Sequence, residues 1–145
     1  MGEAVPHRQM AEIVRKQNPL TLPRSASLQE ACRHMHERKV GAVLITDSKG
    51  RLTGIFTGRD CVRAMSLARD AAETQLKDVM TKKPVTLLPG KSAIEALRVM
   101  RDGGFRHVPV VEQDGRVVGI VSYGDFRGVE HERLDEETGY WERIA

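Results

Sequence analysis

The feature that most constrains the fold is an internal repeat. Residues 19–60 align with residues 84–125 at a constant offset and without a gap. The identical positions include Asp60 and Asp125 and the Gly-Ile pair that precedes each of them. Self-similarity of this kind indicates two copies of one supersecondary unit, which bury their apolar faces together because neither can do so alone.

Each copy predicts the same order of elements. Ser27 and Ser92 each precede a run with helical apolar spacing and have a glutamate three positions on, which is the pattern of a capping box. Two short β-branched runs, separated by a polar turn, then predict buried strands. The unit is therefore strand, helix, strand, strand, helix, and we predict a mixed α/β (α+β) fold in which two such repeats pack with pseudo-two-fold symmetry.

We place the first repeat at residues 10–70, the second at 75–130 and an acidic C-terminal tail at 131–145. Met10 and Val14 lie on one face of a short helix at the start of the first repeat. We expect the apolar residues of the tail to pack against the body or against a second subunit; these are Leu134, Tyr140, Trp141 and Ile144.

Composition narrows the class of protein. With 40% hydrophobic and 30% charged residues the chain reads as globular, and no apolar run approaches the roughly 18 residues of a membrane span. The first residues lack the order of a secretory signal, so we expect a cytoplasmic protein. The net charge of +3 comes from Lys and Arg scattered among acidic residues, which permits nucleic-acid binding but does not indicate it.

The two cysteines fall in apolar positions of the repeat. Cys32 stands opposite Leu97, and Cys61 stands opposite Phe126. We interpret both as small buried hydrophobes rather than as a disulfide or metal ligands. No other pattern suggests a metal site.

The repeated aspartates carry the chemistry. Each follows a hydroxyl residue by three positions, Thr57 before Asp60 and Ser122 before Asp125, where a strand runs into a helix start. Free backbone N–H groups at such a start attract phosphate, and a carboxylate one turn in can accept two hydroxyls of a ribose diol. The same spacing also satisfies a helix cap that needs no ligand. No nucleophile is paired with a base, so we do not expect an enzyme.

These motifs together resemble those of a tandem pair of cystathionine-β-synthase (CBS) domains, the arrangement called a Bateman module. The resemblance covers about residues 10 to 130. It is carried by the two Gly-Ile segments at 54–60 and 119–125, by Asp78 to Thr86, and by Phe105 to Val111.

The resemblance implies roles for individual residues. Asp60 and Asp125 match the ribose-binding aspartates of the family, and Thr57 and Ser122 match its hydroxyl residues near ribose or phosphate. Leu20 and Val85 match positions that meet adenine. Because aspartate repels phosphate, the phosphates are expected nearer to basic residues, and Arg106 and His107 also match a basic pair of the family; the full candidate set is Arg59, Lys83, Arg106 and His107.

The resemblance also implies a function. Family members commonly bind AMP, ADP, ATP or S-adenosylmethionine between the repeats, and many associate as dimers. We therefore expect a regulatory module that senses an adenine nucleotide, forms a homodimer and signals to an effector protein that the sequence does not identify. Whether magnesium accompanies the ligand is left open. The first copy has Gly41-Ala42 where the second has Arg106-His107, so we expect one good cleft and one weaker or empty one.

Two other functions remain open at this stage. The first is a dimerisation or protein-interaction module without bound nucleotide, in which the aspartates only cap helices. The second, which we regard as the less favoured, is a nucleic-acid-binding module suggested by the pI of about 9.1. Only 4% of the residues are aromatic, which gives few stacking platforms for bases.

Overall fold

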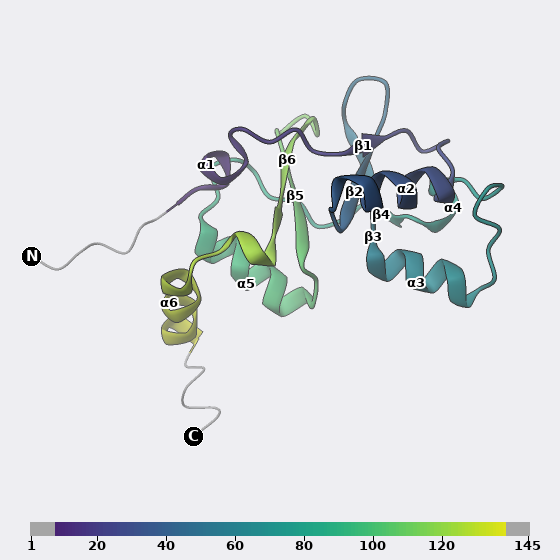
Figure 1. Ribbon diagram of the computed structural model, residues 1–145. Coiled ribbons are helices and arrows are strands. Elements are labelled where there is room, and N and C mark those ends of the chain that lie inside the picture. Colours follow the sequence, from purple (N-terminus) through teal and green to yellow (C-terminus); the bar gives the residue numbers. More distant parts are fainter. Residues whose placement is uncertain (1–7, 139–145) are drawn as a thin grey trace, which may run out of the picture.

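The computed structural model describes residues 8–138, which form two units side by side (Figure 1). The first unit follows the predicted order of strand, helix, strand, strand, helix. Its elements are β1 (Thr21–Leu22), α2 (Leu28–Arg38), β2 (Ala42–Thr46), β3 (Leu52–Thr57) and α3 (Gly58–Ser66). The prediction of a mixed fold built from two related repeats is confirmed.

The second unit repeats this plan with two local differences. Its elements are α5 (Ala93–Gly103), β5 (His107–Val111), β6 (Val117–Ser122), the 3-10 turn η1 (Tyr123–Asp125) and α6 (Gly128–Thr138). The opening strand is reduced to a single bridge between Leu87 and Val110. The helix after the aspartate motif is interrupted, because Phe126 takes an extended conformation between η1 and α6.

The strands of the two units pair in equivalent registers. Val43 lies opposite Phe56 in the antiparallel β2–β3 pair, and Val108 lies opposite Val121 in the β5–β6 pair. The first unit extends this pair to four strands in the order β1-β2-β3-β4, where β4 is Thr81–Lys82. Strand β2 is buried along nearly its whole length, as its β-branched composition predicts.

The units exchange the segments that precede them in the chain. Helix α1 (Met10–Val14) comes before the first unit but packs beside β6 of the second, and the chain then crosses to β1 (Figure 1). Its Met10 and Val14 are buried in the core of the second unit. Conversely, α4 (Leu76–Val79) and β4 lie between the units in sequence but complete the core and sheet of the first.

This exchange explains why both copies keep glycine before isoleucine. A Cβ on Gly54 would lie 2.6 Å from Met80 Sδ and 2.9 Å from the Thr81 carbonyl oxygen. A Cβ on Gly119 would lie 2.6 Å from Val14 Cβ. Each glycine therefore admits an exchanged segment close against its strand.

Gln17 replaces a strand at the edge of the second sheet. Its Nε2 donates to the Ile120 carbonyl at 2.8 Å, and its Oε1 accepts from the Ile120 N–H at 2.9 Å. These two bonds satisfy the backbone groups that β4 satisfies by strand pairing in the first unit. The side-chain amide thus ties α1 and the chain after it to β6.

The pseudo-two-fold axis passes between the two hairpin turns. The Leu52 N–H donates to the Gly115 carbonyl at 2.9 Å, and the Val117 N–H donates to the Gly50 carbonyl at 3.0 Å. Gly50 and Gly115 have φ values of +77° and +91°, which favour glycine. A small apolar cluster packs between the units and contains Ala42, Leu44, Ile55, Leu52, Val117 and Ile120.

The serine caps and part of the tail packing are as predicted. Ser27 Oγ accepts from the Glu30 N–H at 3.0 Å, and Ser92 Oγ accepts from the Glu95 N–H at 3.2 Å. Leu134 of α6 is buried in the core of the second unit. The other apolar residues of the predicted tail, Tyr140, Trp141 and Ile144, lie outside the described residues.

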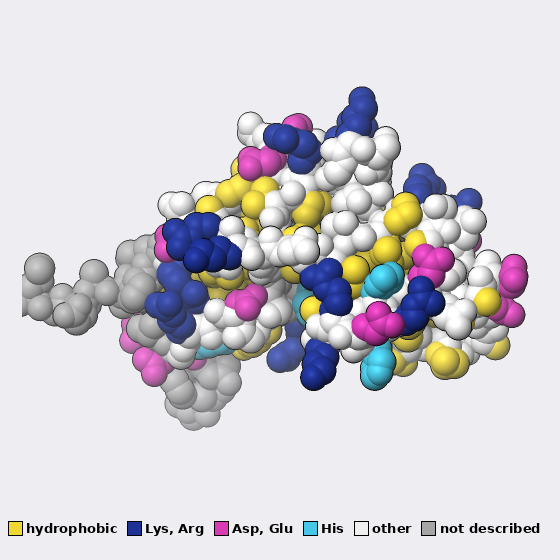
Figure 2. All heavy atoms as spheres, turned by 45° about the horizontal axis from the view of Figure 1, so that its top comes forward, with side chains coloured by type: hydrophobic (Ala, Val, Ile, Leu, Met, Phe, Trp, Pro, Cys, Tyr) yellow, Lys and Arg dark blue, Asp and Glu magenta, His cyan; other side chains and the backbone are white. Residues whose placement is uncertain are grey.

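The surface bears on two of the alternatives. Basic side chains lie in several separate groups on the face shown in Figure 2, interleaved with acidic ones, so this face offers no continuous basic track for nucleic acid. Within residues 8–138, every helix is too short or too polar to cross a membrane.

Candidate functional site

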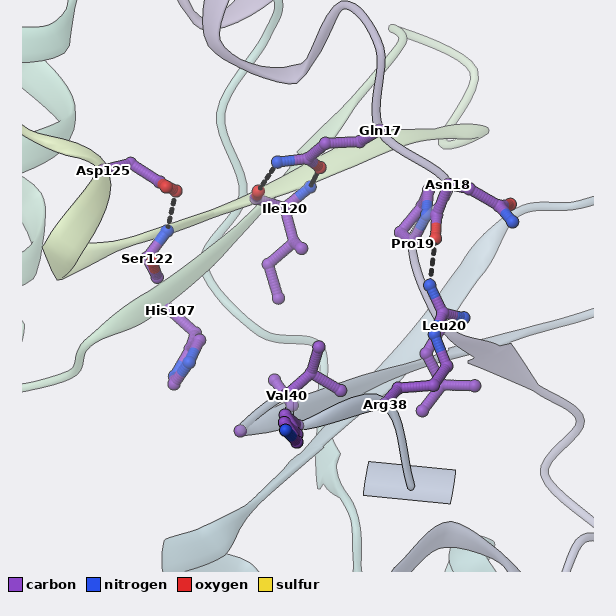
Figure 3. Close-up of a pocket in the computed structure, with 13 residues that line it drawn as sticks. Gln17, Asn18, Pro19, Leu20, Arg38, Val40, His107, Ile120, Ser122 and Asp125 are labelled. Carbon is purple, nitrogen blue, oxygen red and sulfur yellow. Dashed lines mark hydrogen bonds between the residues drawn. The ribbon is translucent and has the colours of Figure 1, made fainter. Parts of the chain in front are cut away.

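A cleft of about 430 Å³ lies between the two units (Figure 3). One side comes from the first unit and the chain that leads into it: Gln17, Asn18, Pro19, Leu20, Arg38, Lys39, Val40, Gly41 and Ala42. The other side comes from the second unit: His107, Ile120, Ser122 and Asp125. The size suits a small organic ligand.

Local backbone structure brings the first-unit residues to the cleft. The Leu20 carbonyl accepts from the Leu44 N–H at 2.9 Å, which fixes Leu20 beside β2. Helix α2 ends at Lys39, whose φ of +55° turns the chain into β2. Val40 and Gly41 follow directly and line the cleft.

Four of the residues predicted from the sequence meet in this cleft: Leu20, His107, Ser122 and Asp125. The other six do not line it: Thr57, Asp60, Arg59, Lys83, Val85 and Arg106. Leu20 comes from the first repeat and Asp125 from the second. The pairing of an apolar wall with a carboxylate therefore exists only because the two repeats pack together.

The Asp125 carboxylate keeps free acceptor capacity. Within residues 8–138 it accepts one hydrogen bond, from the Ser122 N–H at 2.7 Å. This bond is the predicted cap, and it holds the carboxylate at the edge of the cleft. A carboxylate has about four acceptor positions, so Asp125 can also receive two neighbouring hydroxyls of a ligand.

Hydrogen bonds from within the protein occupy the acceptor positions of the Asp60 carboxylate. One oxygen accepts from the Thr57 N–H at 2.9 Å and from its hydroxyl at 3.3 Å. The other accepts from Arg63 at 2.5 Å and from the Thr81 hydroxyl at 2.9 Å. The Asp60 side chain is 3% exposed. The two aspartates that look equivalent in sequence therefore differ in what they offer a ligand.

The surroundings of His107 favour the neutral form of its ring. Burial and the neighbouring Arg106 lower the pKa of His107 below its ordinary value of 6.5, and Asp125 opposes them. Its ring lies so close to Gly41 that a Cβ there would be 3.3 Å from Nε2 and Cε1. A neutral imidazole has one donor and one acceptor nitrogen, so His107 can hydrogen-bond a ligand of either kind.

The basic residues are distributed differently from the prediction. Arg106 is exposed and stacks over the Tyr123 ring, with its guanidinium carbon 4.8 Å from the ring centre. Sequence reasoning missed Arg38 and Lys39, which line the cleft at the end of α2. The repeat held the signal, because the second copy has Gly103 and Gly104 at the equivalent positions; the basic pair belongs to one cleft only.

Comparison with known proteins is consistent with this architecture. The model of the CBS domain family matches residues 10–67 and 76–132. The CBS domain-containing protein CBSCBSPB5 of Arabidopsis thaliana is 46% identical over 103 residues, which are 70% of this chain and 19% of that protein. The chain thus spans about a fifth of the length of the first curated relatives that it matches.

Two solved structures share the fold over nearly their whole length. The CBS domain protein PAE2072 from Pyrobaculum aerophilum, complexed with AMP, has a TM-score of 0.80 and 26% identity, and covers 88% of this chain and 98% of its own. The CBS domain pair of protein MJ0100, in complex with 5′-methylthioadenosine and S-adenosyl-L-methionine, has a TM-score of 0.76 and 25% identity, and covers 92% and 99%.

Proposed function

The chain belongs to the CBS domain family, and on this basis we propose that it is a regulatory module that binds an adenine nucleotide between its repeats and signals to a partner protein. The observation that carries the proposal is the unsaturated Asp125 carboxylate, which faces Leu20 across the cleft. The solved relatives named above hold AMP or 5′-methylthioadenosine and S-adenosyl-L-methionine, which share an adenosine group.

The cleft divides into parts that fit the parts of a nucleotide. Leu20, Val40 and Ile120 provide apolar surface for the base. Asp125 receives the two ribose hydroxyls, and the Ser122 hydroxyl lies beside it. These contacts recognise any adenosyl compound.

The phosphate end is assigned to Arg38, Lys39 and His107. Two cations favour AMP, ADP or ATP over uncharged 5′-methylthioadenosine, and they disfavour the cationic S-adenosylmethionine. The proposed order of affinity follows this charge. Arg59, Lys83 and Arg106 take no part in this cleft.

We propose that the equivalent position in the first repeat, around Thr57 and Asp60, binds no nucleotide. Arg63 and Thr81 already occupy the carboxylate positions that a ribose needs. Opening them would leave a buried carboxylate unpaired, which costs several kcal/mol. We therefore propose one ligand per chain, in the cleft that contains Asp125.

Calorimetric titration of the purified chain tests this function. AMP, ADP, ATP, 5′-methylthioadenosine and S-adenosylmethionine are titrated with and without magnesium. We expect one phosphate-bearing ligand to bind with 1:1 stoichiometry, and Asp125→Asn to weaken it about 10- to 100-fold, because a hydrogen bond to a charged group contributes about 1.5–3 kcal/mol. The cap from Ser122 survives this change, since asparagine also accepts.

Asp60→Asn is the matched control. It alters the same motif in the other repeat, so it is expected to lower stability and leave nucleotide affinity unchanged. If the wild-type protein carries no co-purified nucleotide and still binds none of these compounds at millimolar concentration, the proposed nucleotide function is wrong. The aspartates would then be helix caps only.

A second candidate function rests on the caps themselves. Both aspartates accept from the N–H of the hydroxyl residue before them, which stabilises the fold without a ligand. In this alternative the protein is a dimerisation or interaction module. Three exposed apolar residues at α3 support association with a second copy: Val62, Met65 and Leu67 are 70%, 74% and 64% exposed. A homodimer is compatible with either function, and we propose it for both.

A further inference from the structure

Two thiols meet in the first unit. Cys32 lies on α2 and Cys61 on α3, and their Sγ atoms are 3.5 Å apart. Both side chains are half-buried rather than fully buried, which corrects the sequence-based expectation, and both are free cysteines. They pack at the edge of the core that α2 and α3 share.

Packing alone does not require cysteine at these positions. In the second unit the equivalent residues are Leu97 and Phe126, both buried in its core. Apolar residues therefore occupy both equivalent positions in the second unit. The first unit therefore has two oxidisable thiols at positions where the second unit has two side chains that do not oxidise in this way.

The surroundings do not make a metal site. Structural zinc takes four ligands from Cys, His and acidic residues. Within residues 8–138, no cluster of three or more His, Cys, Asp and Glu side chains is arranged to hold a metal ion. The chemistry left to a close pair of thiols is oxidation.

We propose that Cys32 and Cys61 form a reversible disulfide that joins α2 to α3 when the protein reacts with a small disulfide of the glutathione class. The sulfur atoms lie 3.5 Å apart and would approach to about 2.05 Å in the disulfide. No other pair of cysteines exists in the chain. The proposal goes beyond nucleotide binding and does not depend on it.

The exchange balances in two steps. The thiolate of one cysteine attacks a sulfur of glutathione disulfide, which forms a mixed disulfide and releases one glutathione thiolate. The thiolate of the other cysteine attacks the protein sulfur of that mixed disulfide and releases the second glutathione. Two protein thiols lose two protons and two electrons, and one glutathione disulfide becomes two glutathione molecules.

The environment makes this exchange slow near neutral pH. Burial raises the pKa of the Cys32 thiol to about 11, and the contact with Cys61 adds to the effect. Because the thiolate is the reactive form, the rate should increase as the pH rises. The disulfide, once formed, would restrain α2 and α3 in the first unit only.

The test uses the reduced full-length chain in a mildly alkaline buffer over a series of glutathione to glutathione disulfide ratios. Free thiols are blocked with an alkylating reagent, and the intact mass is measured. We expect one two-electron transition to a monomeric product that carries neither alkyl groups nor glutathione. The thermal midpoint should rise with oxidation and return after treatment with dithiothreitol.

Cys32→Ser and Cys61→Ser are the matched controls. Each retains one thiol and should show no oxidation-dependent rise of the thermal midpoint. The proposal is overturned if the wild type accumulates a stable glutathione adduct, if it forms disulfide-linked dimers, or if both thiols remain alkylatable at the most oxidising ratio. The wild-type masses decide the question even if a serine variant folds poorly.

Discussion

At the scale of single residues, identical side chains in the two repeats have different hydrogen-bond partners. Asp60 and Asp125 both cap the chain after a strand, but Arg63 and Thr81 saturate only Asp60. The position equivalent to Arg63 is Gly128, which has no side chain to donate. The difference in proposed ligand capacity between the clefts thus depends on residues outside the motif.

Gly54→Ala tests the close approach of the exchanged segment. The new Cβ would meet Met80 Sδ at 2.6 Å and the Thr81 carbonyl at 2.9 Å, and the backbone oxygen cannot rotate away. We expect a loss of about 1–3 kcal/mol in the free energy of unfolding, as for other overpacked positions. Urea denaturation measures it.

Gly58→Ala is the control for this change. Nothing lies within 4 Å of a Cβ at Gly58, the first residue of α3. Alanine is the better helix former by up to about 1 kcal/mol, so the variant should be neutral or slightly more stable. Equal losses in both variants would contradict the proposed role of the exchanged segment.

At the scale of elements, one arginine joins four segments of the second unit. Arg8 donates from Nε and Nη2 to the two carboxylate oxygens of Glu130 at 3.0 and 2.7 Å, and from Nη2 to the Asp125 carbonyl at 2.9 Å. Its own carbonyl accepts from the Ala93 N–H at 2.7 Å. Arg8 therefore connects the start of α5, η1 and α6 to the segment before α1.

The charge of Glu130 depends on this contact. Burial raises the pKa of Glu130, but hydrogen bonds from Arg8 and from the Arg127 N–H outweigh it, and the pKa falls below its ordinary value of 4.5. An acid with a lowered pKa in the folded state stabilises the fold above its unfolded pKa. This stabilisation should be lost as the pH falls from about 4.5 through the lower folded pKa.

Arg8→Ala should destabilise the second unit. It leaves a fully buried carboxylate without its ionic partner, which costs about 3–5 kcal/mol. Urea denaturation gives the magnitude, and hydrogen exchange should show faster opening in α6. The double variant Arg8→Met, Glu130→Leu removes both charges and should recover most of the loss. Equal instability of the single and double variants would mean that the ion pair is not the cause.

At the scale of the whole molecule, the exchange of α1 and α4–β4 makes each core depend on distant parts of the chain. The core of the second unit contains Met10 and Val14, and that of the first contains Leu76 and Val79. The boundaries at 10–70 and 75–130 remain a prediction. Because α1 packs into the second core although the whole first unit separates them in the chain, unfolding of the two units should be coupled.

The proposed homodimer is tested by a charge on the exposed face of α3. Met65→Lys should shift the chain toward monomer in sedimentation velocity, because a lysine at the centre of an apolar contact must be desolvated. Leu88→Lys is the control, since Leu88 is also an exposed apolar residue but precedes α5 in the chain and is not part of α3. A wild type that is monomeric at every concentration, or a Met65→Lys variant that stays dimeric, contradicts the proposal.

The sequence by itself determined the architecture. The offset repeat, the serine caps and the alternation of apolar helices with β-branched runs predicted two related units and their elements, because these patterns are local or repeat at a fixed interval. The same comparison showed that the spacing around Asp60 and Asp125 fits a helix cap as well as a ligand site, and the resemblance to CBS domain pairs made Leu20, His107, Ser122 and Asp125 candidates for a site.

Only the tertiary structure decided which candidates meet. The exchange of segments brought Thr81 to Asp60 and closed that carboxylate, while packing about the pseudo-two-fold axis set Leu20 opposite Asp125 and added Arg38 and Lys39. It also brought Cys32 and Cys61 into contact. These contacts join residues that are distant in the chain, and periodicity records which face of an element is buried but not what that face will touch.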